Sequence, residues 1–115
     1  MARTVTQVKA LLPLCPTTDV PDGQGLQVAV DDMQVAVFKV GDRYRVIDDH
    51  CTHGPGLLSE GEVTGEIVEC EFHHGAFNIC TGQVVAPPCM VPVRTYSTEV
   101  RDGQIYIDRD RPAKP

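Results

Sequence analysis

The chain has 115 residues and carries 10 Lys and Arg against 16 Asp and Glu, which gives a net charge of −6. This length suits one domain with a single core, and the acidic balance excludes a surface built to bind nucleic acid or an anionic membrane. The apolar run from Ala10 to Cys15 contains Pro13 and is shorter than the core of a signal peptide. We therefore expect a cytoplasmic protein. Its five cysteines should be thiols or metal ligands, because an odd number leaves at least one cysteine without a disulfide partner.

Strands are predicted over the first half of the chain. The segment TVTQVKAL (residues 4–11) is either a first strand or a loosely held arm. Residues 26–32, 34–40 and 43–48 are short and rich in β-branched side chains, and Gly41-Asp42 separates the last two. This pattern predicts an antiparallel meander.

The C-terminal part predicts a hairpin followed by a tail. The segments YSTEV and IYID flank Asp102-Gly103, a pair that favours tight hairpin turns. Helix content should be negligible, because no window longer than ten residues shows a 3.6-residue apolar period and prolines interrupt the candidates. The charged, proline-bearing tail, residues 109–115, is expected to be frayed.

Two Cys/His pairs lie in the middle of the chain, where the strand pattern weakens. They are Cys51-x-His53 and Cys70-x-x-His73, with sixteen residues between them. Two thiolates and two imidazoles suit either one Zn²⁺ or a [2Fe–2S] cluster with both Cys on one iron and both His on the other. Each loop supplies one Cys and one His, which favours the cluster, and the glycines that follow permit tight turns around it.

The loops CTHGPG and CEFHHGAFNICTG resemble those of Rieske ferredoxins, the small electron-transfer components of ring-hydroxylating dioxygenases of the naphthalene and biphenyl type. The resemblance extends over the whole chain, from GDRYRVID before the first loop to APPCMVPVRTY after the second. It implies one all-β Rieske domain over residues 1–115, with three stacked antiparallel sheets. A cluster-binding subdomain, about residues 49–90, would be inserted between two strands of the base.

The resemblance also implies roles for single residues. Cys51 and Cys70 would hold the inner iron of a [2Fe–2S] cluster, and His53 and His73 the outer one. His74 offers a competing ligand, but the two-residue spacing of His73 matches the family. The surroundings of the cluster would be formed by Gly54, Gly56, Gly75, Phe77, Pro87 and Pro88.

Two further expectations concern positions where the chain differs from relatives. Glu71 stands where the family commonly has proline. Gly75 and Phe77 stand where respiratory Rieske proteins carry serine and tyrosine, whose hydroxyls donate hydrogen bonds to cluster sulfurs. The lack of these hydroxyls predicts a potential near the low end of the Rieske range, around −150 mV. The remaining cysteines, Cys15, Cys80 and Cys89, lack partners at ligand spacing and should be small, semi-buried apolar residues.

Charge is unevenly distributed along the sequence. From Val46 to Val93 there is no Lys or Arg, whereas seven carboxylates fall in this stretch. Any one of them is more simply explained as a solvated surface group, but together they give the cluster end a negative field that favours a basic partner. The residues we expect to dock a partner are Glu60, Glu62 and Glu71.

The sequence therefore predicts a one-electron carrier, not an enzyme in itself. It would accept electrons from a flavin-dependent ferredoxin reductase and donate them to the Rieske cluster of a terminal non-haem iron oxygenase. Two alternatives remain open: a Rieske-type small subunit of a nitrite reductase-like enzyme, and a zinc-stabilised structural domain.

Overall fold

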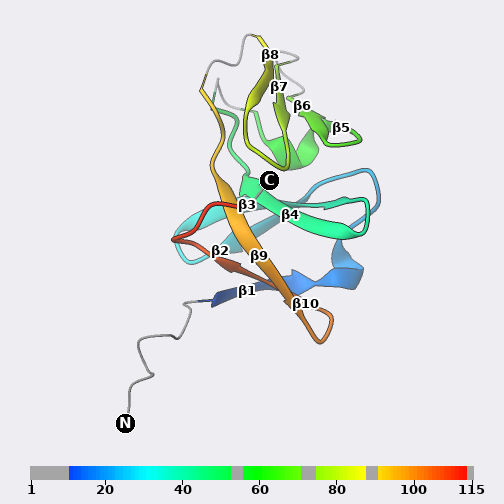
Figure 1. Cartoon of the computed structure of the whole chain (residues 1–115), viewed down its shortest axis with the longest axis vertical. Helices are drawn as coiled ribbons and strands as arrows, with labels where there is room; N and C mark the ends of the chain where they lie inside the picture. Colours follow the sequence, from blue (N-terminus) through cyan, green and yellow to red (C-terminus); the bar gives the residue numbers. More distant parts are fainter. Residues whose placement is uncertain (1–10, 53–55, 71–74, 88–90, 114–115) are drawn as a thin grey trace.

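The computed structural model describes residues 11–52, 56–70, 75–87 and 91–113. They form ten strands in two antiparallel sheets, ordered β1-β10-β9-β4-β3-β2 and β5-β6-β7-β8 (Figure 1). The first sheet contains β1 (Leu11–Pro16), β2 (Leu26–Val30), β3 (Met33–Val40), β4 (Arg43–Asp48), β9 (Thr95–Arg101) and β10 (Gln104–Asp108). The second contains β5 (Glu62–Thr64), β6 (Ile67–Glu69), β7 (Ala76–Asn78) and β8 (Val84–Ala86). Two 3₁₀ turns, η2 (Thr17–Asp19) and η3 (Leu58–Glu60), are the only helical elements among the described residues.

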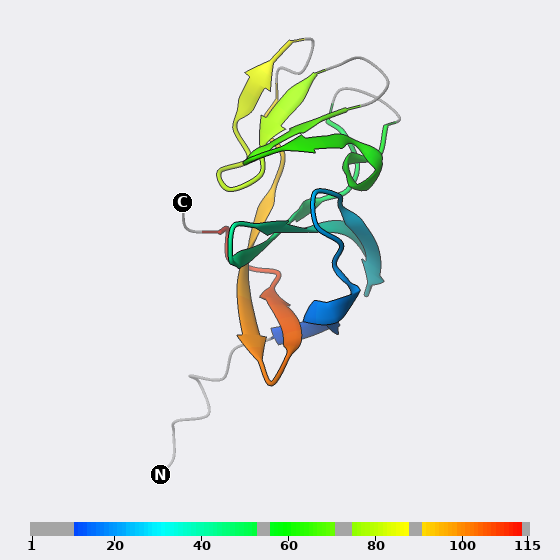
Figure 2. The same ribbon diagram turned by 90° about the vertical axis from the view of Figure 1, so that its right-hand side faces the viewer.

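The six-stranded sheet is divided into two layers at β9. Thr95 and Tyr96 pair with β4, whereas residues 97–101 of the same strand pair with β10. The strands β1, β10 and β9 thus form one layer, β2, β3 and β4 a second, and the four-stranded sheet a third (Figure 2). The expected all-β fold of three stacked antiparallel sheets is confirmed, and the small third sheet lies within the bounds expected for the cluster-binding subdomain.

The middle layer is buried on both faces. Val35 and Val37 of β3 face the lower core, which includes Tyr96 and Ile107, whereas Ala36 and Phe38 face an upper core shared with the third sheet. Strand side chains alternate between faces, so the uninterrupted apolar run of β3 reflects two cores. Burying one such side chain stabilises the fold by about 1.5–3 kcal/mol. The upper core therefore fixes the third sheet to the base.

The predicted meander and C-terminal hairpin are both present. Asp102 and Gly103 have φ angles of 51° and 76°, the left-handed values that a two-residue hairpin turn of this kind requires. The strand at Leu11–Pro16 was not predicted, because it contains Pro13 and Pro16. It is an edge strand with an irregular register between Pro13 and Cys15, a place where prolines are tolerated. The expected strand or arm at residues 4–11 falls almost wholly outside the described residues.

Residues 109–113 of the tail, which composition suggests to be frayed, make polar contacts with the sheet. The backbone N–H of Ser97 donates to the Arg111 carbonyl at 2.9 Å, and the N–H of Ala113 donates to Thr95 Oγ1 at 3.0 Å. Arg109 also pairs with Asp31 and Asp32, at 3.2 and 3.3 Å. The tail buries little apolar surface but is attached to the sheet by polar contacts that composition does not reveal.

Candidate metal centre

The first cysteine loop, residues 49–58, connects the end of β4 to η3. The N–H of Cys51 donates to the Gly56 carbonyl at 2.9 Å, and the N–H of Leu58 donates to the Asp49 carbonyl at 2.6 Å. Between these two bonds, His50 and Leu57 pair as an isolated antiparallel β-bridge. We call this segment loop 1. Its predicted ligand His53, together with Gly54, lies outside the described residues.

The second cysteine loop, residues 70–75, is the tip of the β6–β7 hairpin and is called loop 2. The N–H of Cys70 donates to the Gly75 carbonyl at 2.7 Å. The ladder continues below the tip through the pairs Glu69–Ala76 and Val68–Phe77. The residues predicted within its tip, Glu71, His73 and the competing His74, lie outside the described residues.

The two cysteines thus occupy equivalent positions. In each loop a cysteine N–H donates to the carbonyl of the glycine five residues later. Both cysteines are 1% exposed, and both belong to the upper core, with Leu58, Val68 and Phe77 among their neighbours in that cluster. A thiolate is costly to bury in apolar surroundings unless a cation compensates its charge. Two buried cysteines in matched loops are therefore a donor set that fits the all-cysteine iron of a Rieske cluster.

The other residues predicted to surround the cluster differ in their burial. Gly56 and Gly75 are buried and accept the bonds that close the loops. Phe77 is fully buried in the upper core, where its phenyl ring carries no hydroxyl. Pro87 is exposed at the end of β8, and Pro88 lies outside the described residues.

Sequence reasoning missed the side chains that hold loop 1. The Thr52 hydroxyl donates to the Val91 carbonyl at 2.7 Å, which joins the loop to the segment before β9. Asp49, counted above among the surface charges, is completely buried. Its Oδ1 accepts from the N–H of Ser59 and its Oδ2 from Gln27 Nε2, both at 2.7 Å. The burial of Asp49 could have been predicted from the alternation of side chains along β4. Asp49 lies two residues after the buried Ile47 and therefore on the same face of the strand.

The neighbouring carboxylate, Asp48, faces the other way. It lies opposite Val35 in the β3–β4 ladder and accepts a hydrogen bond from the Tyr96 hydroxyl. Burial, and secondarily this bond, raises the pKa of Tyr96 to about 12. Asp48 and Asp49 are therefore not free surface charges, in contrast to Glu60 and Glu62, which are exposed.

The remaining cysteines are as expected where they are described. Cys15 and Cys80 are buried thiols outside any disulfide, and burial raises the pKa of both. For Cys80, the Arg45 guanidinium opposes this rise but does not cancel it. Both therefore behave as small apolar residues, while Cys89 lies outside the described residues.

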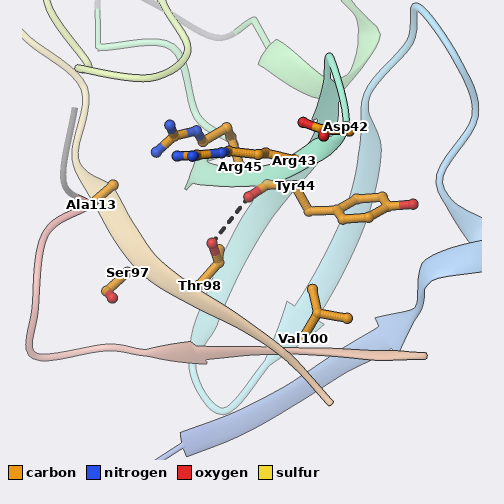
Figure 3. A pocket seen from close by; sticks show the side chains of 8 residues that line it. All are labelled: Asp42, Arg43, Tyr44, Arg45, Ser97, Thr98, Val100 and Ala113. Atoms are coloured by element: carbon orange, nitrogen blue, oxygen red, sulfur yellow. Dashed lines mark hydrogen bonds between the residues drawn. The ribbon is translucent and has the colours of Figure 1, made fainter. Parts of the chain in front are cut away.

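A cavity of about 450 Å³ lies on the base between β4 and β9. The Arg43 and Arg45 side chains extend side by side at its edge, and Thr98 donates its hydroxyl to the Tyr44 carbonyl at 3.0 Å (Figure 3). None of its lining residues belongs to loop 1 or loop 2. The cavity thus concentrates basic side chains away from the two cysteine loops.

Comparison with known proteins identifies the family. The model of the Rieske [2Fe–2S] domain matches residues 10–97. The ferredoxin CarAc of Metapseudomonas resinovorans is 41% identical over 97 residues, covering 84% of this chain and 91% of that protein. The biphenyl dioxygenase ferredoxin subunit of Pseudomonas sp. strain KKS102 is 38% identical over 100 residues, covering 86% and 92%.

Solved structures agree with this result. The Sphingomonas yanoikuyae B1 ferredoxin superposes with a TM-score of 0.82 at 40% identity, covering 88% of this chain and 98% of that one. A chain of the carbazole 1,9a-dioxygenase oxygenase–ferredoxin complex gives 0.80 at 39% identity, covering 88% and 94%. The protein therefore belongs to the Rieske [2Fe–2S] domain family, and its relatives are electron-transfer components. Its cofactor is a Rieske-type [2Fe–2S] cluster, which replaces the zinc alternative.

Two further observations concern the nitrite reductase-like alternative and membrane-spanning segments. A putative nitrite reductase small subunit superposes with a TM-score of 0.74 at only 22% identity, which shows a shared fold and nothing more. Within the described stretches, no helix is long and apolar enough to cross a membrane.

Proposed function

We propose that this protein is the one-electron carrier of an aromatic ring-hydroxylating dioxygenase system. It would take electrons from a flavin-dependent ferredoxin reductase and deliver them to the Rieske cluster of a terminal oxygenase. The observation that carries the proposal is the pair of buried cysteines in matched loops. It is supported by the likeness to dioxygenase ferredoxins over most of the chain. The free thiols of Cys15 and Cys80 fit a reducing, cytoplasmic location.

In this proposal Cys51 and Cys70 hold one iron, and His53 and His73 the other. The bound cluster supplies a centre that gains and loses a single electron. The upper core keeps water from the two thiolates, and the cysteine N–H bonds fix the loop ends. Phe77 offers no hydroxyl to the cluster, which supports a potential near the low end of the Rieske range, around −150 mV.

We also propose that the acidic cluster end, defined by Glu60, Glu62 and Glu71, docks the redox partners. Glu60 and Glu62 are exposed, and no Lys or Arg occurs between residues 46 and 93. In sequence, the described basic residues all lie outside this stretch; they are Lys39, Arg43, Arg45, Arg94, Arg101, Arg109 and Arg111. Such charge separation orients a diffusing protein and accelerates encounter with a basic surface.

Electron delivery to a terminal oxygenase tests this proposal. The reduced protein is mixed with oxidised oxygenase in a stopped-flow instrument, at low and at high salt. The triple variant Glu60→Gln, Glu62→Gln, Glu71→Gln should transfer electrons several-fold more slowly at low salt and about equally at high salt, because salt screens exposed charges beyond about 8–10 Å.

A matched control changes the same net charge on the base. Asp22, Asp42 and Asp102 are exposed in turns of the base, and asparagine also tolerates the positive φ of Asp102. The triple change of these residues to Asn should leave the rate nearly unchanged. If both triple variants slow electron transfer equally, the net charge of the protein and not the acidic cluster end determines docking. If the wild type transfers no electrons to the oxygenase, the carrier function is rejected.

A further inference from the structure

Loop 1 and loop 2 differ in what supports them below the closing bond. Loop 2 stands on a regular ladder, in which Glu69–Ala76 and Val68–Phe77 are paired. Among the described residues of loop 1, the only β-pairing is the His50–Leu57 bridge. At the corresponding place the side chain and main chain of Asp49 make four hydrogen bonds, to Gln27, Gln34, Leu58 and Ser59.

We propose that Asp49 is a positioning residue for the Cys51 loop. This inference rests on the proposed ligand role of Cys51. The carboxylate bonds both the start of η3, through Ser59, and the edge strand β2, through Gln27. It therefore supplies from side-chain atoms the cross-link that the strand ladder supplies in loop 2.

The contacts also account for the burial of this side chain. Asp49 is completely buried, and both of its side-chain oxygens accept from N–H donors. A buried polar group is costly unless hydrogen bonds satisfy it, so the position of Asp49 is fixed by Ser59 and Gln27.

The face on which Asp49 lies strengthens the assignment. Ile47 pairs with Ala36, and Gln27 pairs with Ala36 from the other side, so these residues share the upper face. Asp49 continues that face, toward the cysteines. Asp48 lies opposite Val35 and faces the lower core. Two adjacent carboxylates thus point to opposite sides of one strand end.

This arrangement provides an isosteric test with a matched control. In Asp49→Asn, the amide oxygen can still accept from Ser59, and the amide NH₂ can donate to Gln27 once the Gln27 amide is reversed. The cross-link from loop 1 to Ser59 and Gln27 is kept. Asp48→Asn likewise keeps an acceptor for the Tyr96 hydroxyl. Asp49→Ala removes both acceptors and leaves the buried Ser59 N–H unsatisfied.

The experiment measures the iron content and the EPR spectrum of the purified holoprotein and these three variants. Asp49→Asn should hold as much iron as the wild type, with the same EPR line shape, and so should the control Asp48→Asn. Asp49→Ala should lose at least half of its iron or show an altered EPR line shape.

Two results would overturn the inference. Full iron with an unchanged spectrum in Asp49→Ala would remove the positioning role, and so would a loss of iron in Asp49→Asn as large as that in Asp49→Ala, because Asn keeps the cross-link. If Asp49→Ala fails to fold, Gln27→Ala, which removes the donor to Asp49 Oδ2 alone, takes its place: an altered EPR line shape supports the role and an unchanged one removes it. A wild-type protein without two irons per chain would instead overturn the proposed function, before any variant is compared.

Discussion

Loop 1 and loop 2 perform the same task with different supports. Both end in a cysteine N–H bonded to the carbonyl of a glycine, and both bury that cysteine in the upper core. Below this point loop 2 continues as the β6–β7 ladder. Loop 1 relies on two side chains, Asp49 and Thr52, which bind Ser59, Gln27 and the Val91 carbonyl.

The difference shows how one metal geometry can be built by two physical means. A strand ladder depends on backbone groups and tolerates many sequences, whereas a loop held by side chains depends on particular residues. Substitutions next to Cys51 should therefore disturb the centre more selectively than substitutions next to Cys70.

The largest effect is expected from the proposed ligands. Each loop supplies two of the four proposed ligands, which are Cys51, His53, Cys70 and His73. A change of any one of them to Ala removes one ligand, so the cluster should be lost in every case. His74→Ala should keep it. Iron and sulfide analysis with absorption spectra decides the matter, and a cluster retained in His73→Ala but lost in His74→Ala would reverse the assignment in loop 2.

A large effect on stability is expected from Phe77→Ala, which removes the buried ring beneath loop 2. Truncation of a buried Phe costs about 3–5 kcal/mol in the free energy of unfolding. Urea unfolding followed by circular dichroism measures this loss. The control is Val85→Ala on β8, a residue that is 51% exposed, where the change should stay within about 0.5 kcal/mol. Equal losses in the two variants would refute the upper core as the support of loop 2.

A smaller, local effect is expected from Thr52→Val, which preserves shape but removes the hydrogen bond to Val91. One such bond contributes about 0.5–1.5 kcal/mol. Hydrogen exchange of the holoprotein should therefore become roughly two- to ten-fold faster at the Cys51 amide, by the usual conversion of about 1.4 kcal/mol to a factor of ten. The Cys70 amide serves as the internal reference, and a similar acceleration there would mean that the two loops do not open separately.

The parts of the fold that could be predicted are those with local causes. The hairpin around Asp102-Gly103 follows from turn chemistry, and the meander follows from runs of β-branched residues. The positions of Cys51 and Cys70 follow from their spacing and the likeness of their loops to a known family. None of these required knowledge of contacts between distant residues.

The parts that could not be predicted depend on such contacts. Asp49 resembles any surface carboxylate until Gln27 and Ser59 are seen beside it, 22 and 10 residues away in sequence. The strand at Leu11–Pro16 was hidden by its prolines, because only its place at the sheet edge makes them acceptable. The attachment of the tail through Arg109 and Arg111 depends equally on partners far along the chain.

We propose above all that loop 1 and loop 2 together hold one Rieske cluster. Pulsed EPR of the reduced protein tests this most directly, because it detects the nuclei bonded to the iron. We predict a reduced [2Fe–2S] signal coupled to the nitrogens of two histidines, and the replacement of these ¹⁴N couplings by ¹⁵N couplings when the histidines are labelled with ¹⁵N. A reduced protein without an iron–sulfur signal, or one with a signal that lacks directly bonded nitrogen, would contradict it.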